Sequence, residues 1–166
     1  MAKEMIESEA PLPAAVATTS DLEQFCGLLA EQGLHAALAF LNARTPHRFT
    51  GVFRFDGETL RSVALVDKWD GEVRRGEDVP LSEAYCAVLH DGADVLEVLD
   101  GPADERYPHM QASPVASYCG AVIRDADGEP WGALCHYDVQ PCQVKSSDLP
   151  LLAAAGEVVW NHLAQR

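Results

Sequence analysis

Residues 117–138, S-Y-C-G-A-V-I-R-D-A-D-G-E-P-W-G-A-L-C-H-Y-D, predict two strands joined by a turn. The first part combines small, aromatic and β-branched side chains, which is typical of a half-buried strand. Asp125 and Gly128 favour the turn, because Asp can bond its own backbone and Gly adopts positive φ without steric cost. Pro130 sits just before the returning strand, where its missing N–H removes no ladder hydrogen bond. We therefore expect a hairpin at the centre of a sheet.

The flanking sequence supplies helices near both chain ends and further strands between them. Ser20 begins S-D-L-E, a capping-box pattern that precedes apolar residues at helical spacing. Pro46 ends the second helix, and Asp56-Gly57 is a strong hairpin signal. The expected elements are helices over about 20–33, 34–43 and 82–90, strands over 47–55, 59–66, 95–99, 118–123 and 131–137, and a last helix capped by Ser147 or Asp148.

These elements predict a single α+β domain over residues 20–166. Residues 1–19 are rich in Ala, Pro and Glu without periodicity, so we expect a flexible tail there. About five or six strands, with helices grouped at both ends of the chain, indicate a central antiparallel sheet with the N- and C-terminal helices on one face.

Composition narrows the class of protein and its location. The chain has 166 residues and a formal net charge of −14, and such an acidic surface repels nucleic-acid phosphates. It contains no long apolar run of the kind that spans a membrane and no signal-peptide pattern at its start. We therefore expect a cytoplasmic protein that binds neither nucleic acid nor membrane.

The five cysteines indicate free, mostly buried thiols rather than a disulfide framework. No pair has C-x-x-C spacing, and the spacing of Cys, His and acidic residues is irregular for a metal site. Cys119 and Cys135 would face each other across the hairpin if its turn were centred on Asp127. Alternation sends Cys135 and His136 to opposite faces, so both cannot easily bind one ion. We expect no metal.

The chain resembles a GAF domain over about residues 20–166. The resemblance is carried by the hairpin and by the following segment 149–163, L-P-L-L-A-A-A-G-E-V-V-W-N-H-L. Upstream, L-S-E-A-Y-C-A-V-L, V-L-E-V-L-D and D-E-R-Y-P match the family's order of short helix, third strand and connecting segment. This resemblance implies a GAF/PAS-like fold, with terminal helices on one face and a small-molecule pocket on the other.

The resemblance also implies a function and a set of pocket residues. It indicates a sensory or regulatory module without catalysis, either acting in trans as a stand-alone domain or belonging to a larger protein. It specifies neither the ligand nor any cofactor. The implied apolar walls include Val66, and the expected ligand-binding residues are Phe53, Phe55, Trp69, Tyr85, Cys86, Asp100, Arg106, Tyr107, His109 and Tyr118. Arg106 beside Tyr107 suggests a site for a small carboxylate.

Specialised GAF subclasses fit less well. Cyclic-nucleotide-binding members resemble one another through an N-K pattern, but neither Asn42 nor Asn161 precedes a lysine. Bilin-binding members use a cysteine often followed by histidine, whereas Cys135-His136 lies in the last strand. Free methionine sulfoxide reductases use a cysteine in the loop before the penultimate strand, and residues 100–114 contain none. A thiol enzyme or sensor that uses Cys86 with another cysteine remains an alternative.

The last helix carries an apolar stripe that predicts dimerisation. Its members lie at spacings of three and four residues. They are Leu149, Leu152, Gly156, Val159 and Leu163. Gly156 and Ala154 would allow close approach of a second helix, so we expect a possible homodimer through the terminal helices. A further alternative is a protein-interaction or dimerisation domain whose pocket is filled by its own side chains.

Overall fold

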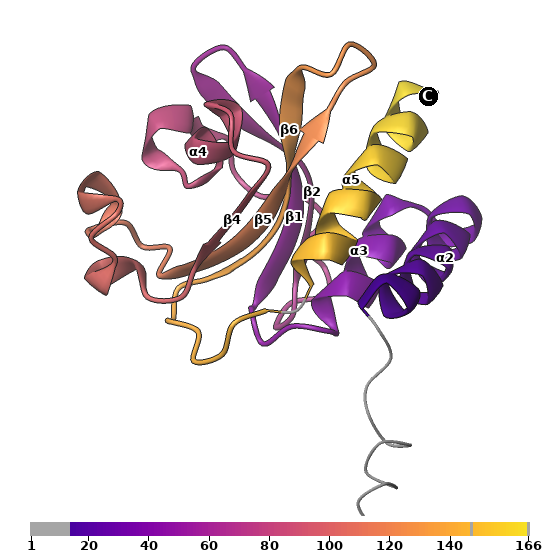
Figure 1. Ribbon diagram of the computed structural model, residues 1–166, viewed down its shortest axis with the longest axis horizontal. Helices are drawn as coiled ribbons and strands as arrows, with labels where there is room; N and C mark the ends of the chain where they lie inside the picture. The colour runs from indigo at the N-terminus through magenta and orange to yellow at the C-terminus, as the bar shows by residue number, and fades with distance from the viewer. Residues whose placement is uncertain (1–13, 147, 166) are drawn as a thin grey trace, which may run out of the picture.

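A six-stranded antiparallel sheet separates the long helices on one face from the short helical elements on the other (Figure 1). The structure is a computed structural model and describes residues 14–146 and 148–165. Within these residues the strand order is β3-β2-β1-β6-β5-β4, and all neighbouring strands run antiparallel. The strands are β1 (Phe49–Asp56), β2 (Thr59–Asp67), β3 (Val79–Pro80), β4 (Val95–Val98), β5 (Ser117–Arg124) and β6 (Pro130–Asp138). The α+β class and the antiparallel sheet are confirmed.

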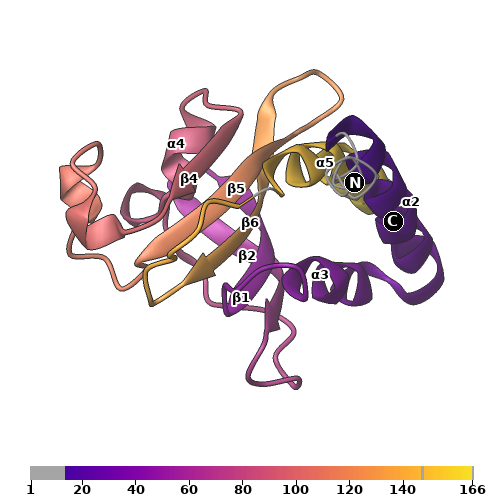
Figure 2. The same ribbon diagram turned by 60° about the horizontal axis from the view of Figure 1, so that its bottom comes forward.

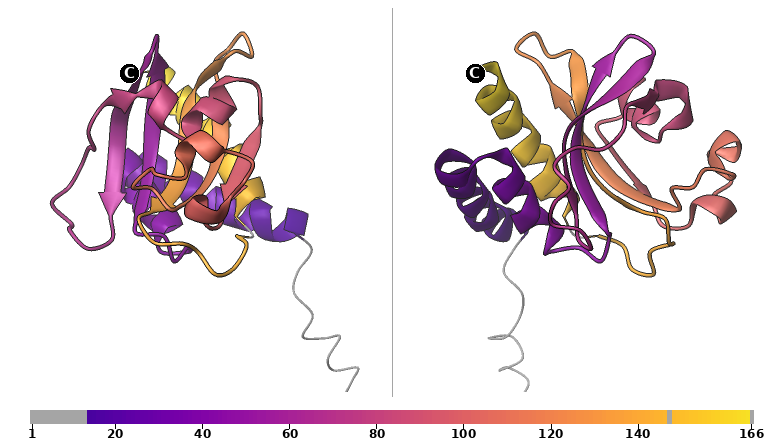
Figure 3. Two further views of the ribbon diagram at one scale, coloured as in Figure 1. Left: turned by 90° about the vertical axis from the view of Figure 1, so that its left-hand side faces the viewer. Right: turned by 180° about the vertical axis from the view of Figure 1, so that it is seen from behind.

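The three long helices cover one face of the sheet (Figure 2). They are α2 (Ala14–Gln32), α3 (Leu34–Asn42) and α5 (Leu149–Ala164). The view from behind in Figure 3 shows the short elements on the opposite face. These are α4 (Cys86–His90) and the 3-10 turns η1 (Leu81–Glu83), η2 (Gly101–Ala103) and η3 (Pro108–Met110). No helix in the described part of the chain has both the length and the apolar character needed to cross a membrane.

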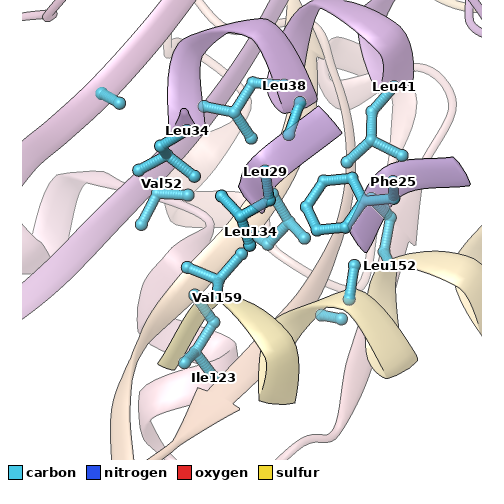
Figure 4. Packing of buried hydrophobic residues seen from close by; sticks show 14 of the residues in the cluster. Phe25, Leu29, Leu34, Leu38, Leu41, Val52, Ile123, Leu134, Leu152 and Val159 are labelled. Atoms are coloured by element: carbon cyan, nitrogen blue, oxygen red, sulfur yellow. The ribbon is translucent and has the colours of Figure 1, made fainter. Parts of the chain in front are cut away.

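Mainly aliphatic side chains fill the layer between the helices and the sheet (Figure 4). Phe25 of α2 and Leu152 and Val159 of α5 are fully buried there. They pack with Ile123 of β5 and Leu134 of β6, which are also fully buried. Each such side chain contributes about 1.5–3 kcal/mol on burial, so this core holds the helices to the sheet.

The apolar stripe of α5 belongs to this core. Leu152 and Val159 are buried, and Leu149 and Leu163 pack against the same cluster. A Cβ added at Gly156 would lie 3.3 Å from the carbonyl oxygen of Val122 in β5. The stripe therefore packs against the sheet of its own chain and does not present its apolar side chains to a second copy, while dimerisation itself stays a prediction. The hydrophobic face of a single-domain helix must first cover its own sheet.

Alternation along the strands gives the sheet a second apolar face. In β5, Cys119 joins the helix-side core and Tyr118 the opposite cluster. In β6, Cys135 belongs to the opposite cluster, whereas His136 points toward Asp148 at the start of α5. The prediction that Cys135 and His136 lie on opposite faces is confirmed.

The cross-strand register corrects one expectation about the cysteines. Cys119 pairs with His136, and Gly120 pairs with Cys135. A bulge between Ile123 and Arg124 shifts the register near the turn, because a bulge sets two residues of one strand against one of the other. Cys119 and Cys135 consequently point to opposite faces and do not meet.

The first helix starts earlier than the sequence indicated. α2 begins at Ala14, so Ser20 lies inside the helix instead of capping it. The preceding run 14–19, A-A-V-A-T-T, contains three alanines, the residue with the highest helix propensity, and extends the helix. The remainder of the expected tail, residues 1–13, lies outside the described residues.

Two short elements and one cap also differ from the prediction. β3 was missed because two residues are too few to show alternation. The expected helix over 82–90 is divided into η1 and α4, since Ala84 between them has extended backbone with φ −120° and ψ 147°. Asp148 precedes α5 as predicted, but its carboxylate pairs with Arg44 and does not cap the helix. The alternative cap, Ser147, lies outside the described residues.

Candidate functional site

A pocket lies on the face of the sheet that the long helices leave free. Strands β1, β5 and β6 supply one side, and η1, the start of α4 and residues 110–115 supply much of the other. Its volume is about 280 Å³, near the lower end of the range for small-molecule sites. The lining residues are Phe53, Leu60, Glu77, Val79, Glu83, Ala84, Tyr85, Cys86, Met110, Ser113, Pro114, Val115, Tyr118, Cys135 and Tyr137.

Four aromatic rings form a large part of the pocket wall. Phe53, Tyr118 and Tyr137 come from three neighbouring strands, and alternation directs all three to one face. The ring centroids of Phe53 and Tyr137 are 6.1 Å apart, and those of Tyr85 and Tyr118 are 5.6 Å apart. Such contacts contribute about 0.5–1.5 kcal/mol beyond buried area, so the rings hold one another in place.

Two thiols and a phenol meet within this wall. The Cys86 sulfur lies 3.1 Å from the hydroxyl oxygen of Tyr118, and the Cys135 thiol lines the same pocket. Hydrogen bonding with Cys135, and then with Tyr118, lowers the pKa of Cys86 although burial opposes this. Burial raises the pKa of Cys135 and of Tyr118 well above their usual values. Cys86 is therefore the first of the three to ionise.

The charged side chains of the described pocket lining are both acidic. Glu77 and Glu83 line the pocket and are exposed to solvent, so they lie at its mouth. Ser113 adds a hydroxyl group. The site thus combines an apolar, aromatic and thiol-bearing interior with two carboxylates at the entrance.

Four of the ten residues predicted to bind ligand line this pocket. They are Phe53, Tyr85, Cys86 and Tyr118, and they come from β1, the residue before α4, α4 itself and β5. The fold brings them together as the family resemblance implied. Their contact with a ligand stays a prediction.

The other predicted apolar wall residues lie outside the lining. Val66 alternates into the helix-side core, and Phe55 packs edge-on against His90 with centroids 4.9 Å apart. Trp69 is 70% exposed, and its ring lies 4.2 Å from the guanidinium carbon of Arg48. Trp69 follows the end of β2, beyond the strand pairing that orients side chains toward the pocket.

The predicted Arg106–Tyr107 pair exists, but the guanidinium already has partners. Arg106 lies 2.6 Å from a carboxylate oxygen of Asp104 and donates a 2.8 Å hydrogen bond to the backbone oxygen of Glu97. Its guanidinium carbon lies 5.2 Å from the centre of the Tyr107 ring. Neither residue lines the pocket, so the structure does not support a carboxylate site at this pair.

The remaining predicted polar residues also lie outside the pocket. Tyr107 packs edge-on against Tyr85, with ring centroids 6.2 Å apart, and thus supports the wall from outside. Asp100 is exposed just before η2. His109 is exposed and lines an adjoining hollow that shares Glu83, Met110, Ser113 and Pro114 with the pocket. The connection 100–114 therefore approaches the pocket mainly through its second half.

Sequence reasoning missed most of the lining. Cys135 and Tyr137 share the pocket face of β6, and strict alternation would have identified both. Glu77 and Val79 reach the pocket around β3, which has no clear sequence signal. The other unpredicted lining residues are Leu60, Glu83, Ala84, Met110, Ser113, Pro114 and Val115.

A separate buried polar cluster lies on the helix side of the sheet. His47 and His136 stack with centroids 5.8 Å apart, and their Nδ1 atoms hydrogen-bond with Thr45 and Thr50 respectively. His136 Nε2 lacks a hydrogen-bond partner among the described residues and lies 3.8 Å from Asp148. Burial, and then the neighbouring His136, lowers the pKa of His47 to about 4. This ring is consequently neutral at pH 7.

The described residues contain no group of three or more His, Cys, Asp or Glu side chains arranged to hold a metal ion.

A family model for the GAF domain matches residues 17–163. The chain belongs to the GAF domain family. Its pocket lies on the sheet face opposite the terminal helices, as the family resemblance implied.

Solved GAF structures share this fold at low sequence identity. The GAF domain from the Acinetobacter phosphoenolpyruvate-protein phosphotransferase has a TM-score of 0.70 and 11% identity, covering 90% of this chain and 94% of that chain. Free methionine-R-sulfoxide reductase from Neisseria meningitidis, in complex with its substrate, has a TM-score of 0.68 and 15% identity, covering 93% of each chain.

A third similar structure carries a chromophore. The phycoerythrobilin-bound GAF domain from a cyanobacterial phytochrome has a TM-score of 0.65 and 14% identity, covering 91% of this chain and 96% of that chain. At these identities the likeness shows the fold alone. The comparison with curated proteins found no match.

Proposed function

We propose that this GAF domain is a sensory or regulatory module that binds a small molecule in signal transduction and has no catalysis of its own. The pocket carries this proposal, because it leaves about 280 Å³ open between apolar walls and a few polar groups. This open volume favours ligand binding over a protein-interaction domain with a filled pocket. We also propose that the protein acts in the cytoplasm and does not bind nucleic acid. The net charge of −14 supports the absence of nucleic-acid binding, because it repels phosphates.

Native mass spectrometry of freshly purified protein tests this proposal. We expect a mass excess that disappears on denaturation, because a preformed apolar pocket retains a non-covalent ligand. Ala84→Trp, which places a large ring in the pocket lining, should abolish the excess. Ala30→Trp on the exposed side of α2 is the matched control and should retain it. A bare wild-type mass, together with no thermal stabilisation by any member of a metabolite library, would contradict the proposal.

The proposal also includes a homodimer formed through the terminal helices. Since the apolar stripe of α5 faces its own sheet, the contact must use the outer faces of α2 and α5. Analytical ultracentrifugation over a wide concentration range should then show a dimer. Monomer alone at the highest concentration would exclude it.

A thiol-based redox role for the same pocket is the second candidate, favoured by the presence of both Cys86 and Cys135 in its lining. The Cys86 thiolate would attack a hydroperoxide oxygen, releasing an alcohol and leaving a sulfenic acid. The Cys135 thiol would then attack the Cys86 sulfur, forming a disulfide and releasing water. The fold of a free methionine-R-sulfoxide reductase is similar, although its sequence identity is only 15%.

Alkylation below pH 7, followed by peptide mapping, tests the thiol role. Rapid labelling of one pocket cysteine is expected, because its hydrogen bonds lower the pKa of Cys86. Cys86→Ser should abolish this fast site. Cys119→Ser should preserve it, since burial raises the pKa of Cys119 to about 12 and its side chain lies in the helix-side core. Slow labelling of both pocket thiols would exclude the role.

A further inference from the structure

The pocket has carboxylates at its mouth and no basic side chain in its described lining. Glu77 and Glu83 are its charged members, and neither has an ion-pair or hydrogen-bond partner among the described residues. Both carboxylates are therefore available to a bound molecule.

The basic groups on nearby segments already have partners. Arg75 pairs with Asp78 at 3.6 Å, and Arg74 donates hydrogen bonds to the backbone oxygens of Gly71 and Val73. Arg61 forms ion pairs with Asp56 and Asp78, and the second of these is 3.1 Å long. Arg106 is paired with Asp104. His109 is exposed in the adjoining hollow and does not line the pocket itself. An anionic ligand would consequently lose hydration and meet two carboxylates without gaining a cationic partner.

The interior favours the opposite charge. Phe53, Tyr85, Tyr118 and Tyr137 surround the pocket with aromatic rings. The faces of such rings attract cations, and aromatic cages bind quaternary ammonium groups in this way. The net charge of −14 adds a long-range field that concentrates cations near the surface.

We infer that the pocket selects a small organic cation, an amine or ammonium group on an apolar body. This inference rests on the proposed function and specifies its ligand class. The apolar body packs against the apolar side chains and thiols of the interior, and the cationic group lies between the aromatic rings and the carboxylates of Glu77 and Glu83 at the mouth. The volume of about 280 Å³ limits the ligand to a small molecule.

Three probes that share one skeleton isolate the effect of charge. We would titrate 3-phenylpropylamine, 3-phenylpropanol and 3-phenylpropionate into ¹⁵N-labelled protein, and follow shifts of amides around the pocket. The amine should bind about tenfold more tightly than the alcohol, a difference of about 1.4 kcal/mol. The acid should bind more weakly than either.

Paired variants separate the pocket carboxylates from the general acidic field. Glu77→Gln/Glu83→Gln should reduce amine affinity about fivefold, in line with about 1 kcal/mol for exposed ion pairs, and leave alcohol affinity unchanged. Glu23→Gln/Glu31→Gln alters the net charge equally on exposed positions of α2 and should change neither affinity.

Several results would overturn the inference. These are binding of the acid at least as tight as binding of the amine, equal weakening by the two double variants, or no binding of any probe. If the alcohol binds as well as the amine, the charge selectivity fails while a small-molecule pocket stands. The native mass measurement does not depend on ligand charge, so it judges the proposed function separately.

Discussion

Gly132 of β6 occupies a position where the backbone of β1 leaves no room for a side chain. A Cβ at this residue would lie 2.1 Å from the carbonyl oxygen of Phe53. β1 and β6 are directly paired at the centre of the sheet, so the ladder resists the shift that a side chain would require.

We expect Gly132→Ala to lower the free energy of unfolding by about 2–3 kcal/mol through overpacking. Gly27→Ala is a matched change in α2, where nothing lies within 4 Å of an added Cβ. It should raise stability by about 0.5–1 kcal/mol, since Ala favours a helix interior over Gly. Urea denaturation measures both. If the Gly132→Ala variant were as stable as the wild-type protein, the close approach of the two backbones would be contradicted.

His47 makes the free energy of unfolding depend on pH, because its pKa differs between the unfolded and the folded chain. Its pKa falls from 6.5 to about 4 in the folded state, chiefly because the ring is buried. As the pH falls below 6.5, the unfolded chain binds a proton that the folded chain does not. The folded state therefore loses stability progressively until the pH reaches about 4, where the folded ring also binds a proton. Burial also lowers the pKa of His136, which acts in the same direction.

The free energy of unfolding should therefore fall by about 3 kcal/mol between pH 7 and pH 4 from His47 alone. Buried carboxylates such as Asp67, whose pKa is lowered below 3.8 by Arg48, destabilise only at still lower pH. Urea denaturation at several pH values checks the slope, and His47→Gln should flatten it. An unchanged slope in this variant would show that His47 does not titrate as described.

At the scale of the elements, Arg44 connects three helices. It follows α3 and lies 3.0 Å from Asp21 of α2 and 3.0 Å from Asp148 at the start of α5. Asp148 is nearly buried, whereas Arg44 is partly exposed. Removing the Asp148 carboxylate leaves the Arg44 guanidinium with Asp21 alone and leaves the orphaned His136 without its nearby anion.

We expect Asp148→Ala to lower the free energy of unfolding by about 2–3 kcal/mol, less than for a fully buried pair because Arg44 retains water contact. Asp94→Ala breaks the 2.7 Å ion pair with Arg124, in which the Asp94 side chain is 80% exposed. This control should change stability by no more than about 0.5 kcal/mol. Equal effects in urea denaturation would refute a special role for the helix junction.

At the scale of the whole molecule, the sheet separates a dense helix-side core from the pocket side. The folded chain also confines a net charge of −14, and repulsion within it opposes the compact state. The Debye length falls from about 30 Å at 0.01 M salt to about 8 Å at 0.15 M, so salt screens this repulsion.

The midpoint of urea unfolding should consequently rise when NaCl increases from about 0.01 M to about 0.15 M. Potassium chloride at equal ionic strength should act similarly if screening is the cause. A midpoint that falls with salt would mean that attractive surface ion pairs outweigh the net repulsion.

Local sequence patterns predicted most of the helices and strands in their correct order. The Asp-Gly turn between β1 and β2 and the 117–138 hairpin were located because turn chemistry and period-two alternation act over a few residues. The early start of α2 and the short strand β3 were not, since alanine-rich extension and two-residue pairing have weak local signals.

The candidate site depended much more on tertiary structure. Phe53 and Tyr118 were identifiable from alternation and the family resemblance. The sequence alone could not exclude Arg106 as a ligand-binding residue. Only the folded connection shows that its guanidinium is bound to Asp104 and to the backbone of Glu97.

By itself, then, the sequence determined the α+β class, the antiparallel hairpin, the opposite faces of Cys135 and His136, and the likeness to GAF domains. Only the tertiary structure decided that Cys86, Tyr118 and Cys135 converge, and that the pocket mouth is acidic. The physical reason is the distance along the chain over which each effect acts. Alternation and turn formation depend on neighbouring residues, whereas convergence depends on register, on the bulge before the hairpin turn and on where distant loops close over the sheet.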